Sequence, residues 1–354
     1  MNDRGMSPVI HSELLRRLPK AELHCHLDGS VRPATLLELG REYKKPMPRD
    51  DVEALTDYMR VDDANSLEDY LARFDVTLGV MQTAEALERI AYELAIDAAI
   101  DGVRYIEVRY APVLNIREGL SLEEAVEAPL RGLARAERDG GAIGRVIVTG
   151  LRHLSPDSSM ELARLAVGYK DQGVVGFDLA GGELGNPASV HAAAFAYARE
   201  NDLACTCHAG EGDSASSVRE AVHRCGAHRI GHATRLIEDE SLTQYVNDRR
   251  IALEICLTSN VQTRAVESYQ EHPLREYFDR GMNVVLNTDN RLMSGTTLTD
   301  EYLHAASTLG FTFGELAEIA LNGFASAFIP WEERERLIVR ARAEIAALVG
   351  SNAA

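Results

Sequence analysis

Short apolar runs alternate with amphipathic stretches along nearly the whole chain. The runs are almost continuously apolar, which is typical of strands in a parallel sheet that is covered on both faces. Strands and helices that alternate in this way predict such a sheet with right-handed crossovers. We expect eight strands, at residues 21–27, 103–111, 145–151, 174–179, 203–208, 229–232, 251–257 and 283–287.

Eight strands over 354 residues predict a closed (β/α)₈ barrel, an α/β fold, with extra helices. A doubly wound open sheet is the main alternative. No Pro/Gly/Ser-rich tract, long block of like charges or internal repeat marks a boundary, so we expect one domain over residues 1–354. Residues 351–354 are expected to form a loose tail. In a barrel, the side chains that carry chemistry collect on the rim where the strands end.

Helical periodicity fills the intervals between the apolar runs. Leu67, Leu71 and Phe74 share one helical face at spacings of four and three residues. A second such face consists of Leu87, Ile90, Ala91, Leu94 and Ala95. Thr312 and Glu315 fit a capping box, in which Thr312 is the N-cap and Glu315 reaches back to it. A later helix is expected over residues 331–348.

The composition narrows the range of partners. The chain has 55 acidic and 37 basic residues and a formal net charge of −18, whereas nucleic acid and anionic membranes both bind basic surfaces. No stretch approaches the ~18 apolar residues of a membrane-spanning helix. Five scattered cysteines without a C-x-x-C pair match neither a disulfide framework nor a thiolate zinc knuckle. We therefore expect a cytoplasmic protein that binds a small molecule.

Two histidines end the first expected strand, in the segment Glu22-Leu-His24-Cys-His26. Side chains two residues apart on a strand point to the same side. Two imidazoles that converge in this way suit a divalent cation of the zinc type. The alternative is a pair of ordinary histidines on an edge strand.

His208 ends the fifth strand, and Glu211 follows it across the small-residue turn Ala209-Gly210. Small residues let the backbone approach a ligand closely. A carboxyl held over a metal site and away from water would have a raised pKa and would work as a general acid or base. The alternative is a loop glutamate that faces solvent.

His232 ends the sixth strand, and Asp289 follows the eighth. His232 is either a hydrogen-bonded core histidine or a catalytic residue that does not bind metal, and the alternative for Asp289 is a helix N-cap. Three imidazoles and one carboxylate make a zinc set that leaves a position for water. Because zinc lowers the pKa of bound water to roughly 7, these strand ends together predict a mononuclear metal hydrolase site.

Signatures of other enzyme classes are missing from the sequence. It has no G-x-G-x-x-G segment and no P-loop, which removes the usual support for dinucleotide or triphosphate binding. It also lacks the G-x-S-x-G elbow of serine hydrolases and the H-x-E and P-C-x-x-C signature of zinc cytidine deaminases.

Five segments, taken in order, resemble those of the adenosine deaminase family of metal-dependent hydrolases. They are Leu18-Pro-Lys-Ala-Glu-Leu-His24-Cys-His26-Leu-Asp28-Gly29-Ser30, Asp178-Leu-Ala-Gly181, His208-Ala-Gly-Glu211, Ile230-Gly-His232 and Asn287-Thr-Asp289. Each segment alone is a modest signal, but together they span nearly the whole chain. The resemblance implies a (β/α)₈ barrel that hydrolyses the 6-amino group of adenosine to give inosine and ammonia in purine salvage.

The resemblance also implies a role for each matching residue. Glu211 matches the acid that protonates purine N1, which draws electron density from the ring so that C6 accepts the attacking hydroxide. His232 matches the residue that orients this hydroxide and stabilises charge beside it. One Zn²⁺ per chain is implied, and its ligands match His24, His26, His208 and Asp289.

Substrate contacts follow from the same resemblance. Gly181 matches a backbone donor to purine N3, and Asp28 matches a contact to a ribose hydroxyl. The helical face of Leu67, Leu71 and Phe74 resembles an apolar lid over the ring, with an ordinary core face as the alternative.

The chain departs from the family pattern at Asn290, where many members carry a second aspartate that meets purine N7. A carboxyl must be protonated to donate to N7, whereas an amide donates at any pH. Because of this exchange, the sequence does not decide which 6-aminopurine is the substrate. Adenosine and 2′-deoxyadenosine are the first expectation, because Asp28 favours a ribose. Free adenine or another 6-aminopurine such as aminodeoxyfutalosine is the second, and a non-catalytic nucleoside-binding relative is the third.

Overall fold

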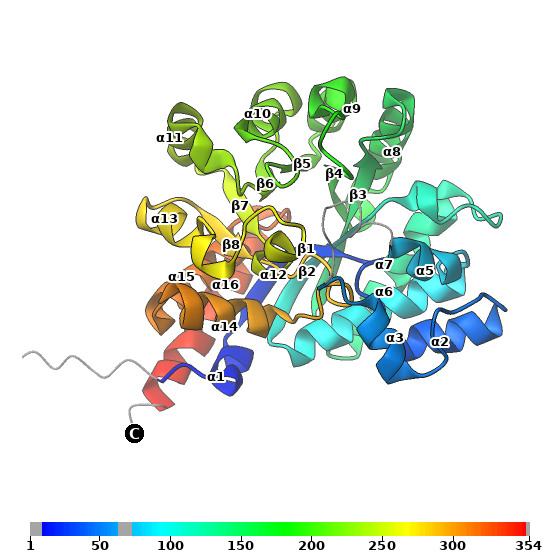
Figure 1. Cartoon of the computed structure of the whole chain (residues 1–354), viewed down its shortest axis with the longest axis horizontal. Coiled ribbons are helices and arrows are strands. Elements are labelled where there is room, and N and C mark those ends of the chain that lie inside the picture. The colour runs from blue at the N-terminus through cyan, green and yellow to red at the C-terminus, as the bar shows by residue number, and fades with distance from the viewer. Residues whose placement is uncertain (1–8, 63–72, 352–354) are drawn as a thin grey trace, which may run out of the picture.

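The computed structural model describes residues 9–62 and 73–351. Eight strands gather in the middle of the molecule and the helices surround them (Figure 1). The strands are β1 (Lys20–His26), β2 (Val103–Tyr110), β3 (Ile143–Leu151), β4 (Val174–Ala180), β5 (Ala204–Ala209), β6 (Arg229–His232), β7 (Ala252–Ile255) and β8 (Val284–Leu286).

The strands form a closed barrel. Each strand pairs in parallel with the next one along the chain, in the order β1 to β8. The ring closes where Asp289, just after β8, forms a parallel bridge with Cys25 of β1. There the Asp289 N–H donates to the His24 carbonyl at 3.0 Å, and the His26 N–H donates to the Asp289 carbonyl at 2.7 Å. The predicted (β/α)₈ barrel is therefore confirmed over the doubly wound alternative.

The helices form the outer layer of the barrel. The longer ones are α1 (Ser12–Arg17), α2 (Pro33–Glu42), α3 (Val52–Met59), α5 (Phe74–Val80), α6 (Ala84–Ile100), α7 (Leu122–Arg138), α8 (Pro156–Gly168), α9 (Ala192–Glu200), α10 (Ala215–Glu220), α11 (Glu240–Asp248), α12 (Leu257–Gln262), α13 (Leu274–Asp279), α14 (Leu298–Leu309), α15 (Phe313–Ala325) and α16 (Trp331–Ser351). Single turns are η1 (Pro112–Leu114), η2 (Lys170–Gln172), η3 (Ala188–His191), η4 (Ala221–Cys225), η5 (Leu236–Glu238) and η6 (Tyr269–Glu271).

The main apolar core lies between strands and helices. The predicted face of α6 is buried, with every one of its five side chains at most 2% exposed, and burial of each larger aliphatic side chain contributes about 1.5–3 kcal/mol. The predicted capping box is present at the start of α15, where Thr312 and Glu315 each bond to the other's backbone N–H.

Inside the barrel lies a set of buried charges that we call the ionic layer: Glu107, Arg109, Arg229 and Glu254. Arg229 Nε donates to Glu254 Oε1 at 2.6 Å, and another nitrogen of the same guanidinium donates to Glu107. Arg109 Nη2 donates to Glu254 Oε2 at 2.9 Å. All four side chains are almost completely buried. Because each charge faces an opposite charge, the layer forms a polar floor beneath the rim.

Most expected strand boundaries differ from the observed ones by one or two residues, and two differences place a residue in another element. The seventh strand ends at Ile255, and Leu257 begins α12 instead of ending the strand, because a helical turn buries this leucine as fully as a strand would. The last helix continues to Ser351, which was expected in the tail, while residues 352–354 lie outside the described residues.

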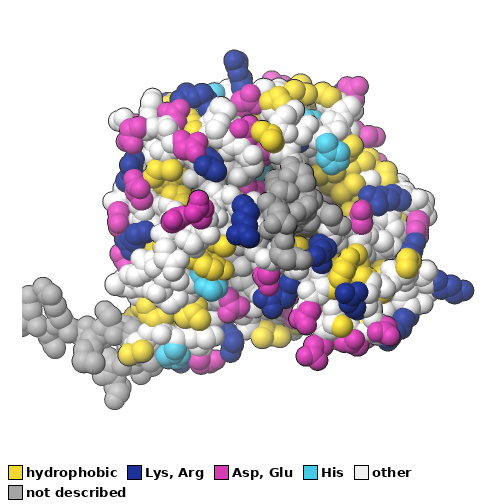
Figure 2. All heavy atoms as spheres, in the orientation of Figure 1, with side chains coloured by type: hydrophobic (Ala, Val, Ile, Leu, Met, Phe, Trp, Pro, Cys, Tyr) yellow, Lys and Arg dark blue, Asp and Glu magenta, His cyan; other side chains and the backbone are white. Residues whose placement is uncertain are grey.

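The surface carries both acidic and basic side chains, as the composition of the chain predicts. Acidic and basic side chains alternate over the face in Figure 2, and the described residues there form no broad basic field. Among residues 9–62 and 73–351, none of the helices is both long and apolar enough to span a membrane.

Candidate active site

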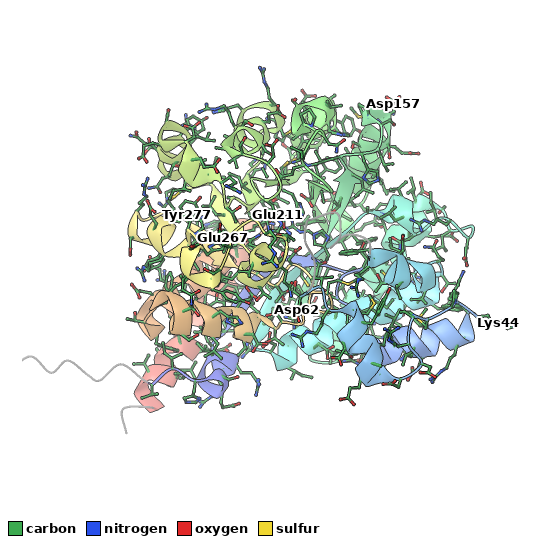
Figure 3. The ribbon with its side chains drawn as sticks, in the orientation of Figure 1. Lys44, Asp62, Asp157, Glu211, Glu267 and Tyr277 are labelled. Carbon is green, nitrogen blue, oxygen red and sulfur yellow. The ribbon has the colours of Figure 1, made fainter. Side chains whose placement is uncertain are left out.

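Polar side chains from opposite sides of the barrel meet at the rim where the strands end. His24 and His26 lie on β1, His208 on β5, and His232 is the last residue of β6. Asp289 follows β8 and closes the ring beside them. Glu211 lies near the middle of the barrel in projection (Figure 3). This is the end of a barrel at which parallel strands deliver their catalytic residues.

Three contacts among the four predicted metal ligands have lengths that suit one ion. His26 Nε2 is 3.1 Å from His208 Nε2, and both His24 Nε2 and His26 Nε2 are 3.3 Å from Asp289 Oδ1. A tetrahedral zinc at ~2.0–2.1 Å holds its ligand atoms about 3.3 Å apart. His24 Nε2 is buried and has no hydrogen-bond partner among the described residues. A cation would supply that missing partner, so the donor set fits a zinc-type ion.

Neighbouring carboxylates orient two of these imidazoles. His24 Nδ1 lies 2.9 Å from Glu254 Oε2, and His208 Nδ1 lies 3.2 Å from Asp178 Oδ1. An imidazole that binds metal through one nitrogen usually donates the other N–H to a carboxylate or carbonyl. Both rings therefore keep their Nε2 lone pairs directed at the rim.

Mutual distance among the described residues favours a different set of four ligands, in which His232 replaces His26. The ligand atoms of His24, His208, His232 and Asp289 all lie within 4.8 Å of one another. His232 Nε2 is also 3.5 Å from Glu211 Oε2. The distances therefore do not decide whether His26 or His232 is the fourth ligand of an ion.

Glu211 is buried rather than exposed on a loop, which excludes the solvent-facing alternative. Its Oε1 has no hydrogen-bond partner among the described residues. Burial, followed by the negative charges of Asp289 and Glu183, raises the pKa of Glu211 well above its usual value. A cation held by the cluster would offset part of this rise. A carboxyl in this environment is suited to hold a proton and donate it near neutral pH.

Glu183 holds the backbone that carries Glu211, a role that the sequence did not reveal. Its carboxylate accepts the N–H groups of Gly210 at 2.9 Å, Glu211 at 2.9 Å and Gly212 at 3.2 Å, and the hydroxyl of Ser217 at 2.6 Å. The turn after β5 is thus fixed by one buried anion.

Three further residues of the site, Glu254, Asn260 and His272, were not predicted from the sequence. Glu254 had a recognisable signal, since it is the one charged residue in the apolar run 252–255. Glu183 had a weaker signal, a carboxylate that directly follows Gly181-Gly182 at a strand end. Asn260 and His272 had none, because both lie in segments without a motif.

Three of the seven described non-glycine residues with positive φ lie at the rim. His232, Ala233 and Asp289 have φ values of 64°, 55° and 61°, in the left-handed region that non-glycine residues rarely adopt. Such conformations persist where the surrounding structure forces them, and they cluster at functional sites.

A cavity of about 260 Å³ opens above the cluster. Four of the predicted substrate contacts line it: Asp28, Phe74, Gly181 and Asn290. The other two, Leu67 and Leu71, lie outside the described residues. Burial raises the pKa of Asp28 to about 7, and the Oδ1 atoms of Asp28 and Asn290 have no hydrogen-bond partner in the described part of the chain. The wall of the cavity therefore offers polar atoms to a ligand.

Asn290 reaches the cavity wall because of a glycine. A β-carbon on Gly29 would lie 1.7 Å from Asn290 Oδ1, so a larger residue at position 29 would displace the amide.

Comparison with known proteins points to one family. A family model described as adenosine deaminase matches residues 19–343. An adenosine deaminase of Mycobacteroides abscessus is 44% identical over 343 residues, which cover 92% of this chain and 94% of that protein. The crystal structure of an adenine deaminase from Arthrobacter aurescens superposes with a TM-score of 0.86 and 29% identity, over 93% of this chain and 99% of that one. An N6-methyl-AMP deaminase from Arabidopsis thaliana gives 0.83 and 30%, over 94% and 98%.

Proposed function

Because the chain belongs to the adenosine deaminase family, we propose that it hydrolyses the 6-amino group of adenosine and 2′-deoxyadenosine, giving the inosine nucleoside and ammonia. The observation that carries the proposal is the buried Glu211. It lines a cavity beside a group of side chains that could hold one ion, and its Oε1 has no hydrogen-bond partner among the described residues. Purine salvage in the cytoplasm is the proposed setting, and the five free cysteines suit a reducing compartment.

The proposed cofactor is one zinc ion, with His24, His26, His208 and Asp289 as its ligands. When bound, zinc lowers the pKa of water so that a nucleophile is available at neutral pH. Ser259 donates to Asp289 Oδ2 at 2.7 Å and holds this carboxylate in place.

The chain's own residues then act on the purine. Glu211 donates a proton to N1, which makes C6 a better electrophile. The backbone N–H of Gly181 is proposed to meet N3, and the Asn290 amide to meet N7. Phe74 covers the ring from α5. Each of these contacts stabilises charge or fixes orientation without a covalent enzyme intermediate.

The choice among 6-aminopurines rests on Asp28. Asp28 lines the cavity, and its Oδ1 has no hydrogen-bond partner among the described residues. A ribose hydroxyl would be a suitable partner for this carboxyl, whereas free adenine would leave it unpaired. An unpaired buried polar group costs about 1–3 kcal/mol. We therefore propose a nucleoside in preference to adenine.

The test is a substrate panel with the zinc-loaded protein. Adenosine, 2′-deoxyadenosine, adenine and N6-methyl-AMP are each followed by the change in ultraviolet absorbance and by ammonia release. The proposal predicts the highest kcat/KM for the two nucleosides. Preference for adenine would support the alternative substrate, and no turnover of any of the four would reject the proposed function.

A further inference from the structure

A buried hydrogen-bonded chain runs from the start of α13 to His232. The backbone N–H of Leu274 donates to His272 Nδ1 at 3.0 Å. His272 Nε2 lies 3.2 Å from Asn260 Oδ1, and Asn260 Nδ2 lies 2.9 Å from His232 Nδ1. The three side chains are at most 3% exposed. No solvent therefore substitutes for any of these partners.

The backbone amide fixes the direction of every bond in this chain. A peptide N–H can only donate, so His272 Nδ1 must accept and the proton of the neutral ring lies on Nε2. That proton is donated to the Asn260 oxygen. The Asn260 amide group consequently points its NH₂ at His232 Nδ1.

The opposite orientation of Asn260 fails on the same grounds. With the amide turned over, its NH₂ would face His272 Nε2, and His272 would need two acceptor nitrogens at once. A neutral imidazole has only one. The direction therefore follows from the Leu274 N–H and does not depend on which amide atom is called oxygen.

We infer that Asn260 and His272 are positioning residues that hold the proton of His232 on Nε2 and so make this histidine a hydrogen-bond donor into the cavity. Its lone pair lies on Nδ1, where the Asn260 NH₂ engages it. His232 then neither binds the metal through Nε2 nor accepts a proton there.

The inference separates the two ligand sets that distance left open. An imidazole that ligates through Nε2 carries its proton on Nδ1 and donates it. His24 and His208 meet this condition, because their Nδ1 atoms face carboxylates. His232 does not, because its Nδ1 faces an N–H donor. The fourth ligand position therefore falls to His26.

This inference deepens the proposed deamination and rests on it for one consequence. If the attacking oxygen stands over the cluster, the Nε2–H of His232 donates a hydrogen bond to it and does not remove its proton. Such a donor stabilises negative charge as it develops on that oxygen.

The first test reads the tautomer of His232 in the wild-type protein. Zinc-loaded, full-length protein with ¹⁵N-labelled histidine gives long-range ¹H–¹⁵N spectra that distinguish protonated from unprotonated ring nitrogens. The His232 signals are identified among the 11 histidines by their loss in His232→Asn. The inference expects a protonated Nε2 and an unprotonated Nδ1. A protonated Nδ1 would overturn it even if deamination is observed, and a protonated Nε2 would support it even if no substrate is turned over.

The second test reverses the last hydrogen bond of this hydrogen-bonded chain, which we call the relay, between Asn260 and His232. Asn260→Asp replaces the donor to His232 Nδ1 with an acceptor of nearly the same shape, so the proton should move to Nδ1. An isosteric exchange that selects the wrong histidine tautomer lowers kcat of a serine protease about 10⁴-fold, and we expect a loss on the order of 10³-fold or more here, with little change in KM. Normal kcat together with an unchanged Nε2–H signal would overturn the inference.

A matched pair at position 272 separates positioning from packing. His272→Gln keeps an N–H donor to Asn260, whereas His272→Phe keeps bulk and loses the donor. We expect His272→Gln to preserve the His232 tautomer and most of kcat, and His272→Phe to mix the tautomers and lower kcat. Thermal unfolding and zinc content, measured for both, identify any loss of structure. Equal spectra and equal kcat for the two variants would contradict the relay.

Discussion

Two groups of buried polar side chains share the barrel, and they are satisfied differently. In the ionic layer, every oxygen of Glu107 and Glu254 accepts a hydrogen bond from the protein, and the only atoms without a hydrogen-bond partner among the described residues of the layer are Nε and Nη1 of Arg109. At the rim, buried polar atoms of four residues have no partner among the described residues: His24 Nε2, Asp28 Oδ1, Glu211 Oε1 and Asn290 Oδ1. Since native proteins rarely leave such atoms unpaired, we infer that a ligand completes the rim, whereas the protein itself satisfies the carboxylates of the layer.

The two groups are connected through one carboxylate. Glu254 binds Arg229 and Arg109 of the layer and also orients His24 at the rim. The layer therefore supports the rim from below, and the proposed chemistry takes place above it. If this division is correct, changes at the rim alter activity while the fold persists, and changes in the layer alter stability first.

Removal of the metal should have the largest effect. A chelator should abolish deamination, because the rim loses the ion that its ligand atoms surround, and added zinc should restore it. The far-UV circular dichroism should stay unchanged, because the ionic layer is untouched. The loss of a ligand present at 1,000 times its Kd lowers stability by about 4.1 kcal/mol, so the melting temperature should fall as well. Deamination by protein shown to be metal-free would contradict the assignment of the rim as a metal site.

Glu211→Gln should have the next largest effect. An amide cannot deliver the proton to N1, so kcat should fall about 10²–10⁴-fold while zinc stays bound. The free energy of unfolding should hardly change, because Oε1 has no partner to lose. The matched control is Glu267→Gln, an exposed glutamate that Figure 3 also labels, and it should leave kcat unaltered. A Glu211→Gln enzyme with normal turnover would remove this residue from the proposed mechanism.

Arg229→Met tests the ionic layer. It leaves two buried carboxylates without their shared cation, which costs about 3–5 kcal/mol of unfolding free energy. The control is Arg16→Met, which breaks an exposed pair with Glu13 and should cost at most about 1 kcal/mol. Denaturant titrations of both variants measure the difference. Equal costs for the two would mean that the layer does not carry the stability assigned to it.

Glu183→Gln should have a smaller effect, which appears in both the stability and the activity of the protein. The amide nitrogen can no longer accept the Gly210 N–H, and a buried donor left unpaired costs about 1–3 kcal/mol. The negative charge of Glu183 also helps to raise the pKa of Glu211. Without that charge, Glu211 loses its proton at lower pH, so the basic limb of the kcat/KM profile should move to lower pH. Movement to higher pH would contradict this electrostatic assignment.

The rim was largely predictable from the sequence, and the layer was not. Histidines and acids placed at strand ends are brought together by any (β/α)₈ barrel, so local sequence was enough to find His24, His208 and Asp289. The partner of His24 is Glu254, 230 positions away. Which interior side chains face one another depends on the stagger of the strands, and that stagger is not encoded in any single motif. Asn260 and His272 were not predicted because they lie in α12 and after η6, in segments without a motif.

Asn290→Asp should have the smallest effect on activity, and it tests whether this residue of the rim contacts the ligand. The exchange preserves shape, and the residue still lines the cavity beside Gly29. A carboxyl donates to N7 only when it is protonated, whereas the amide donates at any pH. The variant should therefore match the wild type at low pH and lose activity as the pH rises, through one hydrogen bond of about 1 kcal/mol, or roughly fivefold in kcat/KM for adenosine. Stability should barely change, because Asn290 Oδ1 has no partner in the described structure. A pH-independent loss would show instead that the side chain acts by shape, and the amide at the rim would then belong with the packing of the barrel and not with its ligand.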